Sequence, residues 1–528
     1  MAATDTLPSQ VSPPEFALSD LPPHAIRGVE AVALPVLPAP KPAADSADAA
    51  EERDGAALLL GPGAADLVEE LGLDAFAVLD AYRASGKAGE ITVHPVTDTS
   101  AANDALRMVI FVGVGEQRPA DLRRAGAALA RATRGYDSVA TSVGAVGDDA
   151  ALRAFVIGLM LGSFGFHWRS TGPKERPLGR VVLSSIADEA AARQTLDKAI
   201  AIGGAGWRAR TLATVPSNLK NPPWLAEQAE QVAAESGLDY DVWDEKRLVD
   251  EGFEGILSVG RASDSEPRLI RLDYKPAKSG RKTPHLALIG KGITFDSGGL
   301  SIKPGESMLN MKRDMTGGAV VLAVMAALGD IGCAIRVTGL IAAAENSISG
   351  SATRPGDVLR HYGGRTTEVT NTDAEGRLVM ADALAYSVAE LKPDALVDVA
   401  TLTGAMKLTL GMRTGGIFAN HDGLADAVRR AGEEAGEPFW RMPLADEYEE
   451  QLASKVADAD NGPKGPGAIM AALFLQHFVG DLPWAHLDIA SAGDSPSENY
   501  EWSSGPTGFG ARALLHWLEQ EQPLEGVL

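Results

Sequence analysis

Short apolar runs alternate with longer apolar or amphipathic segments through the second half of the chain. Continuous apolar runs bounded by Gly, Pro or polar residues are typical of strands buried on both faces of a sheet, whereas the longer segments favour helices. Strands are expected at residues 285–295, 333–345, 395–405 and 484–490, and helices at 317–332, 376–391 and 468–479. This alternation predicts an α/β fold with a mostly parallel sheet flanked by helices.

The first half shows a weaker form of the same pattern. Buried-strand patterns at 29–37, 107–115 and 179–187 are separated by helical periodicity, which indicates a smaller α/β domain. Nine prolines fall in the first 42 residues, where little apolar surface is available for burial. The expected organisation is a mobile extension at 1–25, a smaller N-terminal α/β domain at 26–190, a linker helix at 191–211 and a larger C-terminal domain at 212–528.

Length and charge restrict the function classes. A chain of 528 residues is too long for one compact core, which agrees with two domains. The net charge of −23 argues against nucleic acid as a partner, because that affinity depends on Lys and Arg neutralising phosphates. The single cysteine, Cys333, excludes an intramolecular disulfide and a thiolate metal cage, and it fits the reducing cytosol.

Targeting and membrane signals are weak. The N-terminus lacks the basic and apolar regions of a secretory signal. The longest candidate apolar run, 319–329, has 11 residues and is expected to be a buried helix instead of a membrane span. We therefore expect a cytoplasmic protein with no membrane partner.

Charged residues gather where predicted strands end. Lys291, Asp296, Lys303 and Asp314 come after the apolar run that ends at Gly290. A second group follows the segment "TTEVTN" and comprises Asp373, Glu375 and Arg377. In an extended backbone, positions i and i+2 point the same way, so Asp373 and Glu375 are expected to aim at one point. Sites in parallel sheets lie beyond the carboxyl ends of the strands, where these groups are expected to meet.

Converging carboxylates would repel one another unless a cation lay between them. One or two divalent cations relieve the repulsion, and oxygen ligands favour Zn²⁺, Mn²⁺, Co²⁺ or Mg²⁺. Glycines within "GKGITFDSGGLSIKP" allow close approach of the backbone to a ligand. On spacing alone, ordinary surface carboxylates remain an open alternative to a metal site.

Several motifs resemble those of the leucyl aminopeptidase family of metallopeptidases. They are "GKGITFDSGGLSIKP" (290–304), "NMKRDMTGGA" (310–319), "SGSATRPGD" (349–357), "NTDAEGRL" (371–378), "DVATLTGA" (398–405) and "WAHLDIA" (484–490). They occur in the family's order, and the resemblance covers roughly residues 210–528. Two departures, Ser491 and the segment 316–319, leave the charged positions unchanged.

The resemblance implies roles for individual residues. Two divalent ions, manganese or zinc, would be held by Lys291, Asp296, Asp314, Asp373 and Glu375. Lys291 would have to be neutral to act as a ligand. Lys303 would stabilise the developing oxyanion, and Arg377 would hold a bicarbonate ion that acts as general base. The substrate would be contacted by Met311, Thr401, Leu402, Thr403 and Gly404.

The implied activity is removal of the N-terminal residue, preferably leucine or another apolar residue, from peptide substrates by a homohexamer. Three alternatives remain: another two-metal hydrolase such as a phosphoesterase, a DNA-binding protein on the same scaffold, and a catalytically inactive protein. The lysine among the implied ligands argues against the first, the net charge against the second, and the complete ligand set against the third. His361 and His486 are expected to be packed, hydrogen-bonded core residues.

Overall fold

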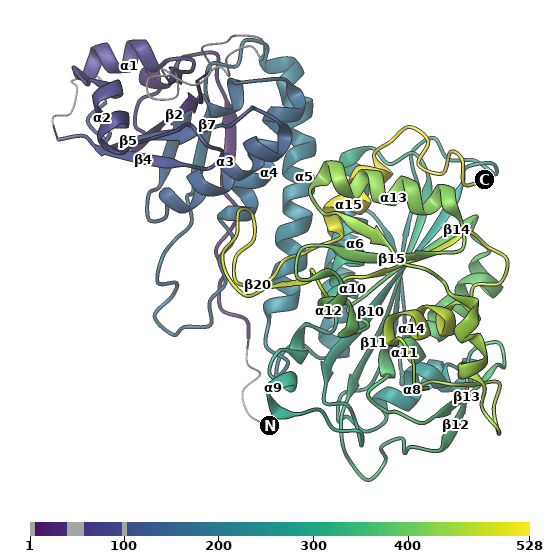
Figure 1. Ribbon diagram of the computed structural model, residues 1–528. Helices are drawn as coiled ribbons and strands as arrows, with labels where there is room; N and C mark the ends of the chain where they lie inside the picture. The colour runs from purple at the N-terminus through teal and green to yellow at the C-terminus, as the bar shows by residue number, and fades with distance from the viewer. Residues whose placement is uncertain (1–5, 40–57, 98–102) are drawn as a thin grey trace, which may run out of the picture. The chain divides into compact units, whose positions relative to one another are not determined.

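The computed structural model describes residues 6–39, 58–97 and 103–528, which divide into two compact units (Figure 1). The smaller unit lies within residues 7–207 and includes the segment 497–503. The larger unit comprises residues 208–496 and 504–528. Helix α5 (Glu189–Thr214) occupies the part of the chain where a linker helix was expected. Residues 1–5 of the expected extension lie outside the described residues.

A mostly parallel sheet forms the centre of the smaller unit. Its strand order is β1 (Glu15–Leu18), β7 (Arg180–Leu183), β6 (Ser138–Thr141), β2 (Ala31–Leu37), β5 (Met108–Gly113) and β4 (Ile91–Pro95), with β3 (Leu59–Leu60) paired to β2. Only β3 and β4 run antiparallel to their partners. The helices that follow these strands are α1 (Ala64–Leu71), α2 (Ala75–Ala81), α3 (Pro119–Ala132) and α4 (Asp149–Gly162).

Strand β1 corrects the expectation of an extension at 1–25. Residues 15–18 pair in parallel with β7, with Phe16 opposite Val181, so this part of the segment belongs to the sheet. A four-residue strand at a sheet edge has little periodicity of its own. Its conformation depends on the ladder with a distant segment, which local sequence does not reveal.

The larger unit is built on an eight-stranded sheet. Its order is β16 (Phe439–Arg441), β15 (Gly415–Ala419), β18 (Trp484–Asp488), β14 (Ala395–Ala400), β10 (His285–Asp296), β11 (Arg336–Asn346), β9 (Arg268–Tyr274) and β8 (Asp239–Trp243). The four central strands, β18 to β11 in this order, are parallel. The antiparallel pairs lie toward the two edges. The predicted mostly parallel sheet is confirmed.

Helices cover both faces of this sheet (Figure 1). One layer consists of α6 (Pro222–Ser236), α10 (Thr316–Ile331), α13 (Asp422–Ala435) and α15 (Ala511–Leu518). The other consists of α8 (Glu254–Gly260), α11 (Glu375–Tyr386) and α14 (Gly467–Gln476). Shorter helices are α7 (Glu245–Glu251), α9 (Gly305–Met308), α12 (Ala405–Leu410), the 3₁₀ turn η4 (Met311–Arg313) and the π-helical turn η5 (Ser387–Leu391).

Small strand pairs complete the larger unit. They are β12 (Asp357–Arg360), β13 (Thr366–Val369) and β17 (Ala459–Asp460) in one group, and β19 (Asp494–Ser495) with β20 (Gly505–Pro506) in the other. The strand predicted at 395–405 ends at Ala400, and Thr401–Gly404 form a loop before α12. That loop lies at the carboxyl end of β14, where a site is expected.

Among the described residues, one helical stretch, 305–331, is long and apolar enough to cross a membrane. Its most apolar part is 83% buried within the protein. Helix α10, which forms most of this stretch, packs on β10 and β11, as expected for the segment 319–329.

Strand β10 contains a bulge just before its end. Ile293 pairs with Ala344 and Phe295 with Glu345, so Thr294 is an extra residue on β10. Side chains alternate along a regular strand, and Lys291 and Asp296 would then face opposite sides of the sheet. The extra residue moves them to the same side.

Helix α10 begins against the ends of two central strands. A Cβ atom at Gly317 would lie 2.0 Å from the carbonyl oxygen of Val399, so only glycine fits this close approach of helix to strand. The residues immediately before α10 are thereby held at the carboxyl ends of β10 and β14.

Candidate metal centre

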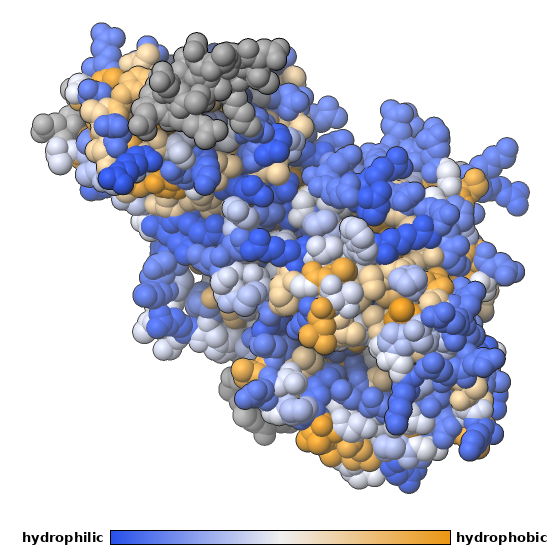
Figure 2. Space-filling view, in the orientation of Figure 1, coloured by the Kyte–Doolittle hydropathy of each residue, from blue (hydrophilic) through white to orange (hydrophobic). Residues whose placement is uncertain are grey.

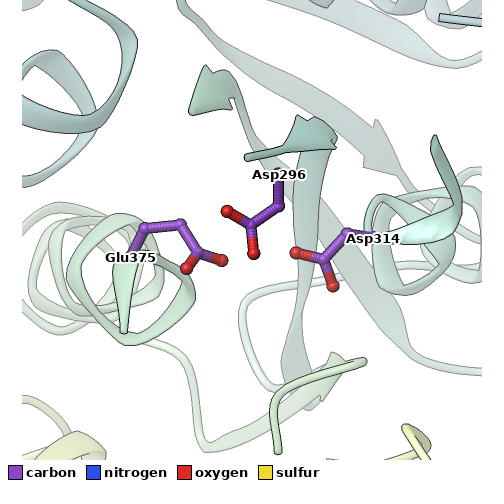
Figure 3. Close-up of side chains that lie close together, drawn as sticks. All are labelled: Asp296, Asp314 and Glu375. Carbon is purple, nitrogen blue, oxygen red and sulfur yellow. The ribbon is translucent and has the colours of Figure 1, made fainter. Parts of the chain in front are cut away.

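Three buried acidic residues converge from separate segments. Asp296 is the last residue of β10, Asp314 follows η4, and Glu375 is the first residue of α11. Each offers one carboxylate oxygen, and these oxygens all lie within 4.8 Å of one another. Figure 3 shows the three carboxylates turned toward a common point. We call these residues the carboxylate cluster.

Several carboxylate oxygens at this point are buried and have only a lysine ammonium as partner. They are Asp314 Oδ2, Glu375 Oε1 and Asp373 Oδ1, which lie against Lys291 or Lys303. With Asp296, four carboxylates share these two ammonium groups, and uncompensated buried charge is strongly unfavourable. An excess of carboxylates at one point suits a hard divalent cation, so the residues present fit the metal that the sequence predicts.

Lys291 lies inside the carboxylate cluster. Its Nζ is 2.7 Å from Asp314 Oδ2 and 2.9 Å from Glu375 Oε1, and it donates to the carbonyl oxygen of Thr401 at 3.3 Å. Burial alone would lower the pKa of Lys291, but the neighbouring carboxylates outweigh burial and raise it. Without a metal ion, the ammonium therefore offsets part of the cluster's negative charge.

Lys303 joins the cluster to Asp373. Its Nζ is 2.8 Å from Asp296 Oδ2 and 2.5 Å from Asp373 Oδ1. Burial opposes its charge, but the carboxylates, Asp296 first among them, raise the pKa of Lys303. Lys291 thus pairs with Asp314 and Glu375, whereas Lys303 pairs with Asp296 and Asp373.

The pKa values of three aspartates at this point are raised, so these carboxyl groups are harder to ionise than usual. Burial is the main cause of the raised pKa of Asp296, Asp314 and Asp373. The charge of Glu375 adds to the effect at Asp296 and Asp314, and the two lysines oppose it. The centre therefore stores electrostatic repulsion that a divalent cation would relieve.

The prediction that Asp373 and Glu375 point the same way from one extended strand is wrong. Asp373 lies in a turn after β13, and Glu375 begins α11, so the two are not neighbours on one extended strand. Asp373 contacts Lys303, whereas Glu375 contacts Lys291. A turn, not strand alternation, brings the two carboxylates to the same site.

Arg377 lies two residues after Glu375 on α11, and its described hydrogen bond is not to the carboxylates. Its Nη1 donates to the carbonyl oxygen of Asn461 at 2.8 Å. Burial lowers the pKa of Arg377 to about 10, although Glu375, Asp460 and Asp488 favour its charge. The guanidinium is therefore a desolvated cation beside the cluster, which suits the binding of a small anion.

The predicted substrate residues lie on two segments next to the cluster. Met311 begins η4, three residues before Asp314. In the loop 401–404, Thr401 Oγ1 donates to Asp314 Oδ1 at 2.7 Å. Leu402 is half-buried, Thr403 is buried and Gly404 is exposed.

Sequence reasoning missed Asn346, the last residue of β11. Its Nδ2 donates to Asp296 Oδ1 at 2.8 Å and to the carbonyl oxygen of Thr372 at 3.1 Å. The amide of Gly298 donates to the same oxygen of Asp296 at 2.8 Å. These bonds orient Asp296, and the position of Asn346 at a strand end was the signal that could have revealed it.

A second group of buried charges lies beside the first. His486 Nδ1 contacts Asp398 Oδ1 at 2.5 Å, and Trp484 Nε1 donates to Asp398 Oδ2 at 2.8 Å. Asp488 lies two residues further along β18 and is also fully buried. We call Asp398, His486 and Asp488 the support cluster. The packed, hydrogen-bonded setting predicted for His486 is confirmed.

The packed, hydrogen-bonded setting predicted for His361 is also confirmed. Its Nδ1 contacts Asp382 Oδ1 at 2.9 Å and its Nε2 contacts Thr367 Oγ1 at 2.9 Å, with all three residues buried. Asp382 also accepts from the amides of Ile256 and Tyr362. This group of hydrogen bonds joins α8, α11 and the small sheet.

The chain matches known proteins over nearly its whole length. Residues 207–515 match the family described as "Cytosol aminopeptidase family, catalytic domain", and residues 57–169 match the N-terminal domain of the same family. A "Probable cytosol aminopeptidase" of Streptomyces avermitilis is 41% identical over 483 residues, covering 88% of this chain and 92% of that protein. One from Corynebacterium glutamicum is 42% identical over 426 residues, covering 79% and 81%.

Solved structures agree. The bottromycin maturation enzyme BotP is 34% identical with a TM-score of 0.78, covering 93% of this chain and 99% of that one, and a second BotP structure is a complex with Mn. A mutant of tomato leucine aminopeptidase is 29% identical with a TM-score of 0.81, covering 97% and 98%. The chain belongs to the cytosol aminopeptidase family, whose members are peptide hydrolases that remove N-terminal residues.

Proposed function

We propose that this aminopeptidase uses two divalent ions, manganese or zinc, to release leucine and other apolar residues from the N-termini of peptides. The observation that carries the proposal is the convergence of three buried carboxylates which, with Asp373, outnumber the two lysine ammonium groups beside them. The Mn complex of BotP, a structural neighbour, supports the choice of metal.

The ions would be held by Lys291, Asp296, Asp314, Asp373 and Glu375. When bound, divalent ions supply a Lewis acid for the scissile carbonyl and a water of lowered pKa. The rigid backbone around these residues fixes their directions: Asp296 ends a central strand, and Glu375 begins a core helix. Asn346 holds Asp296 in place from behind.

Two further side chains act on the substrate itself. Lys303 carries a flexible ammonium donor between Asp296 and Asp373, from where it would donate a hydrogen bond to the oxyanion that develops on the scissile carbonyl. Arg377 would hold a bicarbonate ion, whose oxygens accept the proton released by the attacking water. Its position beside Asn461, away from direct contact with the carboxylates, leaves guanidinium nitrogens for that anion.

The first residue of the peptide would lie against Met311 and the loop 401–404. The exposed and half-buried parts of these residues are apolar at Met311 and Leu402, which favours leucine-like side chains. Apolar pockets discriminate by only about 1–3 kcal/mol per methylene group, so we expect a broad preference.

We further propose a cytoplasmic homohexamer that does not bind nucleic acid. A single copy exposes large apolar side chains on the larger unit, with Leu309 78% and Leu408 92% exposed, and Leu300 and Ile302 also exposed. Apolar patches interrupt the mostly hydrophilic surface of this unit in Figure 2. Exposed apolar groups of this kind favour association between copies. Light scattering during size-exclusion chromatography measures the oligomeric state.

The activity is tested with leucine p-nitroanilide as substrate. The purified protein is treated with a chelator, assayed, and assayed again after addition of Mn²⁺ or Zn²⁺. N-acetyl-leucine p-nitroanilide and p-nitrophenyl phosphate serve as control substrates. We expect metal to restore hydrolysis of the free-amine substrate only.

Hydrolysis of the acetylated compound would show that a free amine is not needed, which contradicts an aminopeptidase mechanism. Hydrolysis of the phosphate alone would favour a phosphoesterase. Activity that survives exhaustive chelation would contradict the role of the metal.

A further inference from the structure

We propose that Asp488 is a positioning residue that sets the conformation of the substrate loop 401–404. The inference rests on the proposed function for the role of that loop, although the contacts on which it stands do not. Asp488 is the last residue of β18 and is fully buried, and it lies outside the carboxylate cluster.

Four donors converge on this one carboxylate. Leu402 N donates to Oδ1 at 3.2 Å, and Ala490 N donates to the same oxygen at 3.1 Å. Thr403 N and Thr403 Oγ1 donate to Oδ2 at 3.1 Å and 2.7 Å. Three of the four bonds therefore come from the loop, and they fix two consecutive peptide units.

The opposite side of the loop is fixed by the carboxylate cluster. Thr401 Oγ1 donates to Asp314 Oδ1 at 2.7 Å, and Lys291 Nζ donates to the Thr401 carbonyl oxygen at 3.3 Å. The loop is thus held between two acids, Asp314 at the metal centre and Asp488 beneath it. Because Asp488 fixes Leu402 and Thr403, it determines where the apolar side chain of Leu402 meets a substrate.

The chemistry of the site requires a carboxylate at 488. Backbone N–H groups reach both oxygens and cannot reverse their role as donors. An asparagine would have to turn its NH₂ group toward either Leu402 N and Ala490 N or Thr403 N. In either orientation the buried NH₂ group would face a backbone N–H group, and because both are donors the loop would have to move.

The variants are Asp488→Asn, Thr403→Val and Thr403→Ser, each tested in the full-length protein. Glu437→Gln is the matched control, because Glu437 is a buried carboxylate that accepts from Gly510 N, Ala513 N and Arg512 Nε and does not contact the loop. The measurements are kcat and KM for leucine p-nitroanilide, Mn²⁺ affinity, and amide hydrogen exchange in the peptide that contains 402 and 403.

We expect Asp488→Asn to raise KM about tenfold and to speed exchange at 402 and 403, the size expected for loss of one or two buried hydrogen bonds. Mn²⁺ affinity should change by less than about threefold, because Asp488 does not contact the metal centre. Thr403→Val should raise KM by a smaller factor, and Thr403→Ser, which keeps the hydroxyl, should restore it.

An unchanged KM together with unchanged exchange in Asp488→Asn would overturn the inference. An equal rise of KM in Glu437→Gln would also overturn it, because the effect would then be general destabilisation. If wild type hydrolyses no peptide substrate, the proposed function fails, and hydrogen exchange still decides the role of Asp488: faster exchange at 402 and 403 supports it and unchanged exchange contradicts it.

Discussion

The carboxylate cluster and the support cluster both contain buried acids at the same large sheet, but they differ in the partners of their carboxylate oxygens. In the support cluster, both oxygens of Asp398 and both oxygens of Asp488 accept hydrogen bonds. In the carboxylate cluster, Asp314 Oδ2 and Glu375 Oε1 have only the ammonium of Lys291 as partner. Buried acids alone therefore do not indicate a metal site. Acids that outnumber the cations beside them and have oxygens without a neutral donor do.

The comparison predicts opposite consequences of substitution. A residue of the support cluster should matter for stability whether or not metal is present. A residue of the carboxylate cluster should matter mainly for metal binding and catalysis. The following experiments separate these two cases.

The largest effect is expected for Glu375→Gln. The substitution keeps the size of the side chain and removes the charge, so Mn²⁺ affinity should fall by at least about 100-fold and activity with it. Glu345→Gln is the matched control, because Glu345 is half-buried next to Asn346 and hydrogen-bonds to Ser263 outside the cluster. Isothermal titration with Mn²⁺ measures the affinity. Wild-type affinity in Glu375→Gln would remove this residue from the centre.

The second largest effect is the fall in kcat expected for Lys303→Met. Loss of an oxyanion donor typically lowers kcat by about 10²–10³, and we expect a fall in this range with Mn²⁺ still bound. Lys282→Met, at an exposed position, is the control for the loss of a lysine. Steady-state kinetics at saturating Mn²⁺ give kcat. A loss of metal binding that accounts for the lost activity would show that Lys303 holds the carboxylates instead of the substrate.

The free energy of unfolding, measured in the presence of a chelator, distinguishes the two clusters directly. Asp398→Ala leaves His486 and Trp484 Nε1 without their buried acceptor and should cost about 2–4 kcal/mol of unfolding free energy. Asp314→Ala removes a partner of Lys291 and the acceptor of Thr401 Oγ1, but it also relieves repulsion from Asp296 and Glu375, so its cost in metal-free protein should be smaller than that of Asp398→Ala. Urea denaturation of both variants measures the difference. Equal costs would mean that both clusters are structural.

The smallest effect is a pH dependence in the support cluster. Burial opposes the charge of His486, but Asp398 outweighs burial, and the pKa of His486 is raised. A raised pKa stabilises the fold below the ordinary histidine value of about 6.5, and this contribution disappears as pH rises through the folded-state pKa. The stability difference between wild type and His486→Phe should therefore shrink as the pH rises from 6 to 9. Urea denaturation across this range detects it, and a difference that grows with pH would contradict the assigned charge.

The sequence predicts the central sheet well because its strands are buried on both faces. Apolar runs leave few alternatives to a strand, and the order of strand and helix follows from them. Prediction failed where long-range contacts decide the conformation. Thr401 and Thr403 favour a strand by type, yet their hydroxyl groups bond to Asp314 and Asp488, and β14 ends at Ala400.

The candidate site was predictable as a set of residue types and not as a geometry. Charges after predicted strand ends indicated Asp296, Asp314, Asp373 and Glu375, and the family resemblance assigned their individual roles. The turn that separates Asp373 from Glu375 was hidden, because an i, i+2 pair looks the same in a strand and at a helix start. Asp488 was hidden for another reason: its role depends on a loop 85 residues away.

The bulge at Thr294 makes the centre sensitive to the length of the chain as well as to its composition. Deleting Thr294 would leave every ligand in the sequence and would restore a regular ladder between β10 and β11. It would also turn Asp296 to the far side of the sheet from Lys291 and remove the carbonyl that accepts from Ser217 Oγ at 2.9 Å. In this part of the protein, a gap of one residue in an alignment would therefore be as informative as the loss of a ligand.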